Sequence, residues 1–129
     1  DKINLLDVDH SAVDWNGKKQ KDTSGEENTI AIPGFEKVTL YANETKQAVN
    51  FHNPEINDCY FKISLIHPDG SVLWISDLIE PGKGMYSIEL EKTLAVGEYE
   101  NAVLKYECFS LNDQSPLNGS EINLKLVVV

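Results

Sequence analysis

The sequence predicts an all-β fold, an antiparallel β-sandwich of seven to eight strands, from three observations. Short apolar runs recur about every eight to twelve positions between turn residues, a spacing typical of sandwiches and barrels. Within several runs apolar side chains alternate with polar ones, as Phe61, Ile63 and Leu65 do, which is the pattern of half-buried antiparallel strands. No apolar stripe with helical spacing continues over three turns.

Eight segments carry the strand pattern, and turn residues separate them. His67-Pro68-Asp69-Gly70 is a hairpin signal, because proline presets φ and glycine takes a positive φ. Pro81-Gly82-Lys83-Gly84 separates the next two segments. The expected strands are Thr29 to Ile32, Lys37 to Ala42, Gln47 to His52, Cys59 to Ile66, Ser71 to Ser76, Met85 to Glu91, Glu98 to Ser110 and Glu121 to Val129.

The chain divides near residue 29 by composition. Residues 1–28 are polar and poorly periodic, and residues 18–27 contain no large apolar side chain. This composition is typical of a linker. We therefore expect an extended N-terminal arm or tether over 1–28, with Ala12 to Trp15 lying on the domain or on a partner and the remainder loose. The sandwich is expected over 29–129.

Composition narrows the classes of partner. Twenty-one acidic residues against 11 basic ones give a formal charge of −10. Such a surface repels phosphate backbones and anionic lipids, so no nucleic-acid partner is expected. No apolar run approaches the roughly 20 residues of a membrane helix, so this segment is not expected to insert into a membrane.

The sequence around Tyr99 favours an immunoglobulin-like arrangement. Gly97-Glu98-Tyr99 stands at the entry to the penultimate long strand, where immunoglobulin-like domains often place a tyrosine whose hydroxyl closes the preceding loop. We interpret Tyr99 as such a corner residue.

Cys59 and Cys108 are a predicted disulfide. Cys59 opens one strand, and Cys108 lies near the end of the penultimate strand. These two strands are antiparallel neighbours in an immunoglobulin-like sheet, so the cysteines should be close enough to bridge. Closing a loop of about 50 residues would contribute roughly 4 kcal/mol in the chain-entropy model, and it would require an oxidising compartment. The alternative is two buried thiols acting as small apolar side chains.

Nothing in the sequence predicts catalysis, a metal site or a cofactor. His10, His52 and His67 have no metal-ligand spacing, and no nucleophile or phosphate-binding motif is present. The loops Asn53 to Asp58 and Asn112 to Glu121 contain oxygen donors but not the order of a calcium loop. We interpret both as polar turns and expect a protein that is not an enzyme.

The aromatic residues are the better indication of binding. Tyr41 and Tyr60 fall on the polar phase of their strands, so both are candidate exposed binding residues. Exposed rings on a sheet face can stack against sugars, although Trp74 and Tyr106 are expected in the core.

The chain resembles a family of uncharacterised immunoglobulin-like surface or lipoprotein domains of Gram-positive, often gut-dwelling bacteria. The resemblance is carried by short pieces over nearly the whole chain: Val13-Asp14-Trp15-Asn16-Gly17, Ile32-Pro33-Gly34-Phe35, Asn53-Pro54, Cys59-Tyr60-Phe61, Leu78 to Lys83, Gly97-Glu98-Tyr99 and Leu117-Asn118-Gly119. It implies an exported protein in which residues 1–28 follow a signal-bearing or lipid-anchored start.

Together these features predict an exported or cell-surface module that binds or adheres to an unknown protein or glycan through strand faces or loops. The module is expected to be a monomer. A passive structural spacer and a carbohydrate-binding module are the alternatives.

Overall fold

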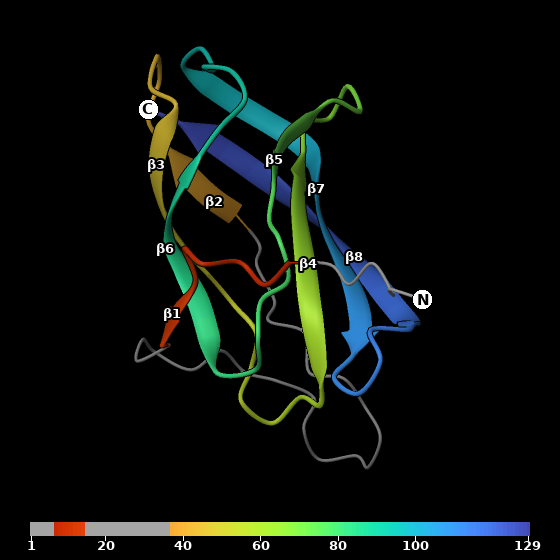
Figure 1. Ribbon diagram of the computed structural model, residues 1–129. Coiled ribbons are helices and arrows are strands. Elements are labelled where there is room, and N and C mark those ends of the chain that lie inside the picture. Colours follow the sequence, from red (N-terminus) through yellow and green to blue (C-terminus); the bar gives the residue numbers. More distant parts are fainter. Residues whose placement is uncertain (1–6, 15–36) are drawn as a thin grey trace.

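The computed structural model describes residues 7–14 and 37–129, which form two β-sheets packed face to face (Figure 1). The predicted all-β sandwich is confirmed, and the described chain contains no helix. The strands are β1 (Val13–Asp14), β2 (Lys37–Leu40), β3 (Lys46–His52), β4 (Cys59–Ile66), β5 (Val72–Ile75), β6 (Lys83–Glu89), β7 (Gly97–Ser110) and β8 (Pro116–Val128).

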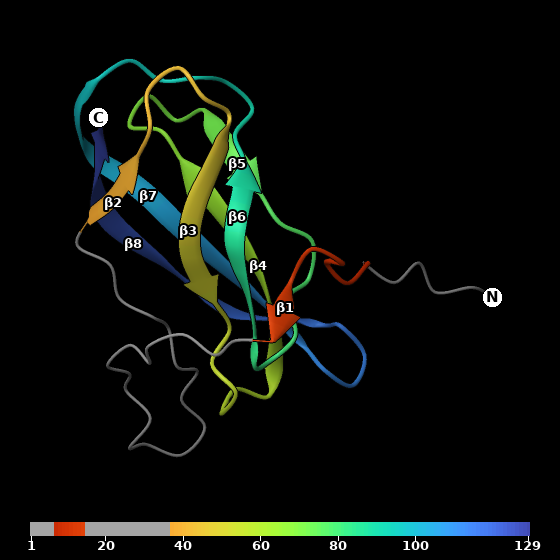
Figure 2. The same ribbon diagram turned by 90° about the vertical axis from the view of Figure 1, so that its left-hand side faces the viewer.

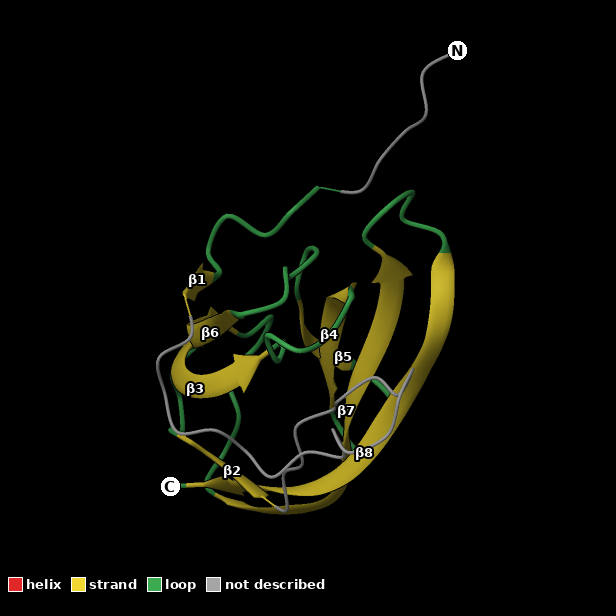
Figure 3. Ribbon diagram, turned by 90° about the horizontal axis from the view of Figure 1, so that it is seen from below, coloured by secondary structure: helices red, strands yellow, loops and turns green. Residues whose placement is uncertain are grey.

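The two sheets differ in size and together enclose the core. The smaller sheet has the order β1-β6-β3, and the larger one has the order β2-β8-β7-β4-β5. Figure 3, seen along the sandwich, shows the two sheets on opposite sides of the interior. Among these eight strands, every pairing is antiparallel except that of β2 with β8, which is parallel.

The core is built from the alternate residues that face inward on both sheets. Phe51 of the smaller sheet stacks on Trp74 of the larger one, with ring centroids 5.7 Å apart. Phe61 and Tyr106 meet edge to face at 5.2 Å within the larger sheet, a geometry that aromatic pairs prefer. Trp74 and Tyr106 are therefore core residues, as expected.

Most strand positions agree with the expected ones, and β4 has the expected bounds. The exception is β8, which begins at Pro116 instead of Glu121. Pro116 pairs with Phe109 as the first residue of its strand, a position where a missing N–H is tolerated. The loop before β8 is therefore shorter than the sequence suggested.

The Tyr99 corner is present. The Tyr99 hydroxyl donates to the carbonyl oxygen of Ala95 at 2.8 Å, and the ring meets His67 edge to face at 5.3 Å. The phenol thus closes the loop that leads into β7, as expected.

Residues 7–14 are attached to the sandwich rather than loose. The Asp9 amide donates to the Leu78 carbonyl at 2.7 Å, and the Leu78 amide donates to the Asp7 carbonyl at 3.0 Å. Asp14 forms a 2.9 Å ion pair with Lys83 on β6, and Figure 2 shows β1 beside that strand. The extended lie expected from Ala12 onward is present up to Asp14. The expectation of a loose chain before Ala12 was wrong for Asp7 to Asp9, because backbone hydrogen bonds do not depend on apolar side chains.

Residues 1–6 and 15–36 lie outside the described part of the chain, and with them Trp15 and the expected strand Thr29 to Ile32. The predicted boundary near residue 29 stays a prediction.

Buried amide side chains hold the loop between β3 and β4 in place. Asn53 is fully buried, and its Nδ2 donates to the carbonyls of Cys59 at 2.8 Å and Ile79 at 2.9 Å. Its Oδ1 accepts from Asn57 Nδ2 at 2.9 Å. The polar turn expected here is present, but its two asparagines face the interior, where Asn57 bonds Asn53 and Asn53 bonds two backbone carbonyls.

Candidate functional site

The candidate site lies on the outer face of the five-stranded sheet, toward the hairpin between β7 and β8. Tyr60 on β4 pairs with Phe109 on β7, and Phe109 pairs with Pro116 on β8. Both rings belong to residues that are half-buried and alternate with the buried Cys59 and Cys108, so they point away from the core. We call Tyr60, Phe109 and Pro116 the aromatic row.

A hollow of about 520 Å³ adjoins this row on β7 and β8. Its volume falls in the range of small-ligand sites, roughly 300–1,000 Å³. Phe109, Pro116 and Leu117 supply apolar surface, and the remaining lining is mostly polar. The lining residues are Lys105, Tyr106, Glu107, Cys108, Phe109, Pro116, Leu117, Gly119, Ser120 and Glu121.

A β-bulge shapes the hollow. The register between β7 and β8 shifts between Tyr106 and Cys108, so β8 carries one extra residue there. Gly119 lies in this segment, and a Cβ at that position would collide with the carbonyl oxygen of Tyr106. Only glycine lets the two backbones approach this closely.

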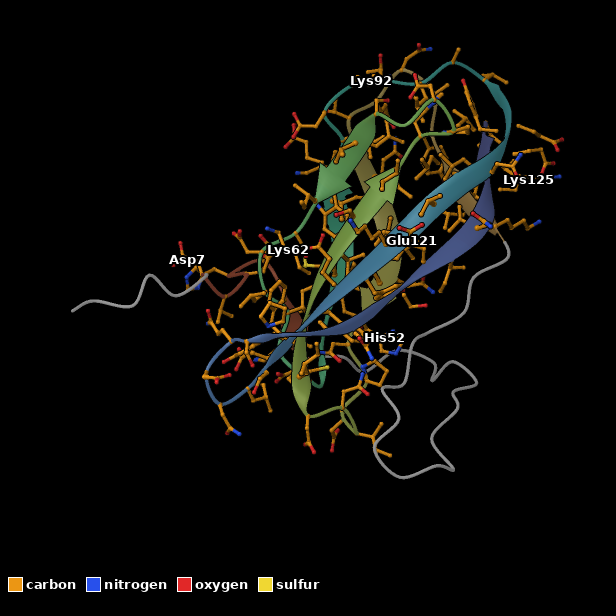
Figure 4. All side chains as sticks on the ribbon, turned by 90° about the vertical axis from the view of Figure 1, so that its right-hand side faces the viewer. Asp7, His52, Lys62, Lys92, Glu121 and Lys125 are labelled. Atoms are coloured by element: carbon orange, nitrogen blue, oxygen red, sulfur yellow. The ribbon has the colours of Figure 1, made fainter. Side chains whose placement is uncertain are left out.

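The outer face of the five-stranded sheet is neutral, in contrast to the rest of the described residues. Figure 4 looks onto this face, with Lys62, Glu121 and Lys125 labelled. The face carries four lysines and four glutamates, whereas the other described residues include three lysines and twelve carboxylates. The charged residues of the outer face are Lys37, Lys62, Lys105, Lys125, Glu98, Glu100, Glu107 and Glu121.

Ion pairs organise the charges on this face. Lys125 Nζ lies 2.8 Å from Glu98 Oε1 and 3.2 Å from Glu100 Oε1. The hydrogen bond to Lys125 lowers the pKa of Glu98, and the same contacts raise the pKa of Lys125. Closer to the hollow, Lys105 Nζ lies 3.3 Å from Glu107 Oε1.

Tyr41 does not belong to this site. It follows β2, whose last residue, Leu40, pairs with Val128 near the end of β8, while Tyr60 shares its row with Pro116 at the start of β8. The two tyrosines therefore lie at opposite ends of the sheet. The Tyr41 side chain is 53% exposed, and the buried Gln47 side chain bonds both the amide and the carbonyl of Tyr41.

Cys59 and Cys108 lie on neighbouring strands, but they are not directly opposite each other. Cys59 pairs with Ser110 and Cys108 pairs with Phe61, so the cysteines are diagonal across β4 and β7. Each is 1% exposed, and both thiols are free in this structure. A hydrogen bond joins them; it lowers the pKa of Cys59 and, together with burial, raises the pKa of Cys108. The contact agrees with the expected proximity, and the disulfide itself stays a prediction.

The histidines lie apart from the aromatic row. His10 is exposed, His67 packs against Tyr99, and His52 is buried at the end of β3, where desolvation lowers its pKa. Over residues 7–14 and 37–129, no three His, Cys, Asp or Glu side chains are grouped to hold a metal ion. No helix in that part of the chain could span a membrane.

Comparisons with protein-family models, with curated proteins and with solved structures gave no match to this chain.

Sequence reasoning selected Tyr60 but missed Phe109 and Pro116 as its neighbours. Phe109 is one of several aromatics in the sequence, and Pro116 lies within the segment that was expected to be a polar turn. Once β4 and β7 are recognised as neighbours, alternation alone places Tyr60 and Phe109 on the same face. The partner strand and its register were the missing information.

Proposed function

We propose that this chain is a non-enzymatic binding module of an exported or cell-surface protein, and that it contacts its partner through the outer face of the five-stranded sheet. The observation that carries the proposal is the aromatic row beside the hollow. Tyr60 and Phe109 are cross-strand partners on the solvent side of the sheet, where rings provide large contact area at low cost in conformational entropy.

Charge supports the choice of this face. The other described surfaces are strongly acidic, and they would repel most soluble proteins of similar charge. The outer face combines apolar side chains with paired charges, which is the composition of a recognition surface with a polar surround.

The proposal of an exported protein rests on the cysteines. Their thiols touch on adjacent strands, so two-electron oxidation by a disulfide-carrying oxidoreductase would join the Sγ atoms and transfer two hydrogens to the oxidant. Mass spectrometry of protein isolated from its native compartment without reductant tests this. Loss of two hydrogens, regained on reduction, supports the disulfide, and two free thiols contradict it.

Binding is tested with the folded chain on panels of glycans and extracellular proteins, using Tyr60→Ala and Phe109→Ala as variants. Each substitution is expected to weaken a binding signal at least about tenfold, the size of an interface hot spot. Tyr41→Ala is the matched control, because Tyr41 is an exposed tyrosine at the opposite end of the sheet.

The outcomes separate the alternatives. If all three variants lost binding equally, or if none of them lost binding to a partner of the unsubstituted chain, the assignment of this face would be contradicted. No binder at all would favour a passive spacer.

A glycan is the second candidate partner, because the lining of the hollow combines apolar side chains, Phe109 and Pro116, with polar ones such as Glu107, Ser120 and Glu121. Sugar rings present the same combination of apolar faces and hydroxyl edges. Binding confined to glycans, and competed by the free sugar, would identify this function.

A further inference from the structure

We propose that the outer face of the five-stranded sheet pairs with the same face of a second copy of this chain, as a weak symmetric contact. This inference rests on the proposed function, because it names the partner of the same face. It replaces the monomer expected from the sequence.

The face carries four successive rows on β4 and β7, given by their register. Tyr60 and Phe109 form the first row, and Lys62 with Glu107 forms the second. Ser64 with Lys105 forms the third, and the fourth is Ile66 with Val103. The two outer rows are therefore apolar, and the two inner rows carry opposite charges on β7, at Glu107 and Lys105.

This order is self-complementary. A twofold axis lying across the strands, between the second and third rows, reverses the strand direction of the second copy and exchanges the first row with the fourth. Phe109 then lies over Val103 of the second copy, and Glu107 lies over Lys105 of the second copy. Each of these contacts occurs twice, as in any isologous interface.

The flanking strands add apolar residues to the two outer rows. On β5, the exposed Val72 pairs with Ile66 and enlarges the aliphatic row. On β8, Pro116 continues the aromatic row. Because the twofold axis lies across the strands, it keeps their order, so β8 faces β8 and β5 faces β5 of the second copy; the match of rows is therefore made by β4 and β7.

The charge distribution favours a second copy at this face over any other. Four lysines and four glutamates balance here, while the other described surfaces carry twelve carboxylates and three lysines. Two copies meeting through those other surfaces would bring like charges together. The formal charge of −10 still repels at long range, and salt screens that repulsion within about 8 Å at physiological ionic strength.

The contact is expected to be transient. The residues of the four rows are half-buried within their own chain, apart from the buried Ser64, so each contributes limited new area. This places the interface among the weak ones, which bury less than about 1,200 Å² in total.

Analytical ultracentrifugation of the full chain, from about 10 µM to 1 mM and at two salt concentrations, tests the proposal over the range expected for weak contacts. We expect a monomer–dimer equilibrium that strengthens as salt rises. Glu107→Lys should weaken it about tenfold, because it creates two Lys–Lys contacts across the axis. Lys105→Glu should have the same effect, and the double variant Lys105→Glu/Glu107→Lys should restore the dimer.

Glu44→Lys is the matched control. Glu44 is exposed in the turn between β2 and β3, and its reversal changes the net charge by the same amount as Glu107→Lys. If general repulsion alone governed association, both variants would strengthen the dimer. The proposal requires Glu107→Lys to weaken it and Glu44→Lys to leave it equal or stronger.

Thermal unfolding establishes that each variant is folded, and Lys105→Glu provides the same test if Glu107→Lys does not fold. A monomer at every concentration overturns the proposal, and so does a dimer that Glu107→Lys does not weaken. A monomer that binds another partner through Tyr60 and Phe109 would overturn the second copy as partner while leaving the binding function intact.

Discussion

Replacing Asn53 by alanine should strongly destabilise the fold, because this side chain is the centre of a buried hydrogen-bond network. The substitution removes two hydrogen bonds donated to the carbonyls of Cys59 and Ile79 and one accepted from Asn57. Asn53 is 0% exposed, so water does not readily replace these bonds. At roughly 1 kcal/mol for each hydrogen bond, Asn53→Ala should lower the free energy of unfolding by about 3 kcal/mol.

Two further features of the structure refine this value. The Ile79 carbonyl also accepts from the Phe61 amide at 3.0 Å, so it keeps one partner and the loss there is moderate. The Asn53 backbone is itself anchored, since its amide donates to the Lys83 carbonyl at 2.9 Å and its carbonyl accepts from the Gly82 amide at 2.8 Å. The loop should therefore keep its position, and the loss should come from the side-chain bonds.

Urea unfolding at pH 7, followed by tryptophan fluorescence, measures the effect. Asn57→Ala is the comparison variant, because it removes the bond that Asn53 accepts and leaves the two bonds that Asn53 donates, so it should cost less than Asn53→Ala. The dependence of the free energy on urea should keep its slope, since the exposed area changes little. A loss below about 1 kcal/mol for Asn53→Ala, or an equal loss for both variants, would refute the network as the source of stability.

Three more predictions concern single groups. The buried Tyr106 hydroxyl has no hydrogen-bond partner among the described residues, so Tyr106→Phe should leave the free energy of unfolding unchanged or raise it by up to about 1 kcal/mol. Tyr99→Phe should instead cost about 0.5–1 kcal/mol, because it loses the bond to Ala95; the opposite order in urea unfolding would contradict both assignments. Gly119→Ala should cost about 1–3 kcal/mol in the same assay, because its Cβ collides with the Tyr106 backbone, and an unchanged stability would contradict the close approach. Burial lowers the pKa of His52, so between that lowered value and about pH 6.5 the unfolded chain binds a proton that the folded chain does not. Stability should therefore decrease as the pH decreases through this range, by up to about 1.4 kcal/mol per pH unit. His52→Gln should reduce that slope, and an identical pH profile for both proteins would exclude His52 as its source.

The strands were predictable because each is specified by its own residues. Period-two alternation located β4 with its observed bounds, and Pro68 with Gly70 marked the hairpin that follows it. Alternation is less regular at β6, where Tyr86 and Ser87 are both exposed between the buried Met85 and Ile88. In the same stretch the pairing of β6 with β3 shifts by one residue, between Ala48 and Phe51. A bulge arises where two strands pair, so the residues of one strand alone did not predict it.

The candidate site was predicted only in part. Tyr60 was identified from the polar phase of its strand, and Tyr41 was selected by the same reasoning. Strand phase indicates that a side chain faces solvent, but it does not indicate which exposed residues share a surface. The register of β4, β7 and β8 joins Tyr60 to Phe109 and Pro116 and leaves Tyr41 at the far end.

The buried asparagines were likewise predicted only in part. Asn53 and Asn57 occur in a segment whose composition is typical of an exposed turn, and that turn exists. Their side chains nevertheless face inward, and Asn53 donates hydrogen bonds to the carbonyls of Cys59 and Ile79. These bonds form only when two distant segments of the chain meet.

The amino-acid sequence by itself determined the all-β class, the positions of most strands and the turns between them, because alternation and turn chemistry act over a few neighbouring residues. Only the tertiary structure decided that Cys59 and Cys108 lie diagonally in contact, that Asp7 to Asp14 bind to the sandwich, and that balanced charges gather on one sheet face. Each of these depends on which strands are neighbours and in what register, and the free energy that selects a register is summed over the whole sheet and core.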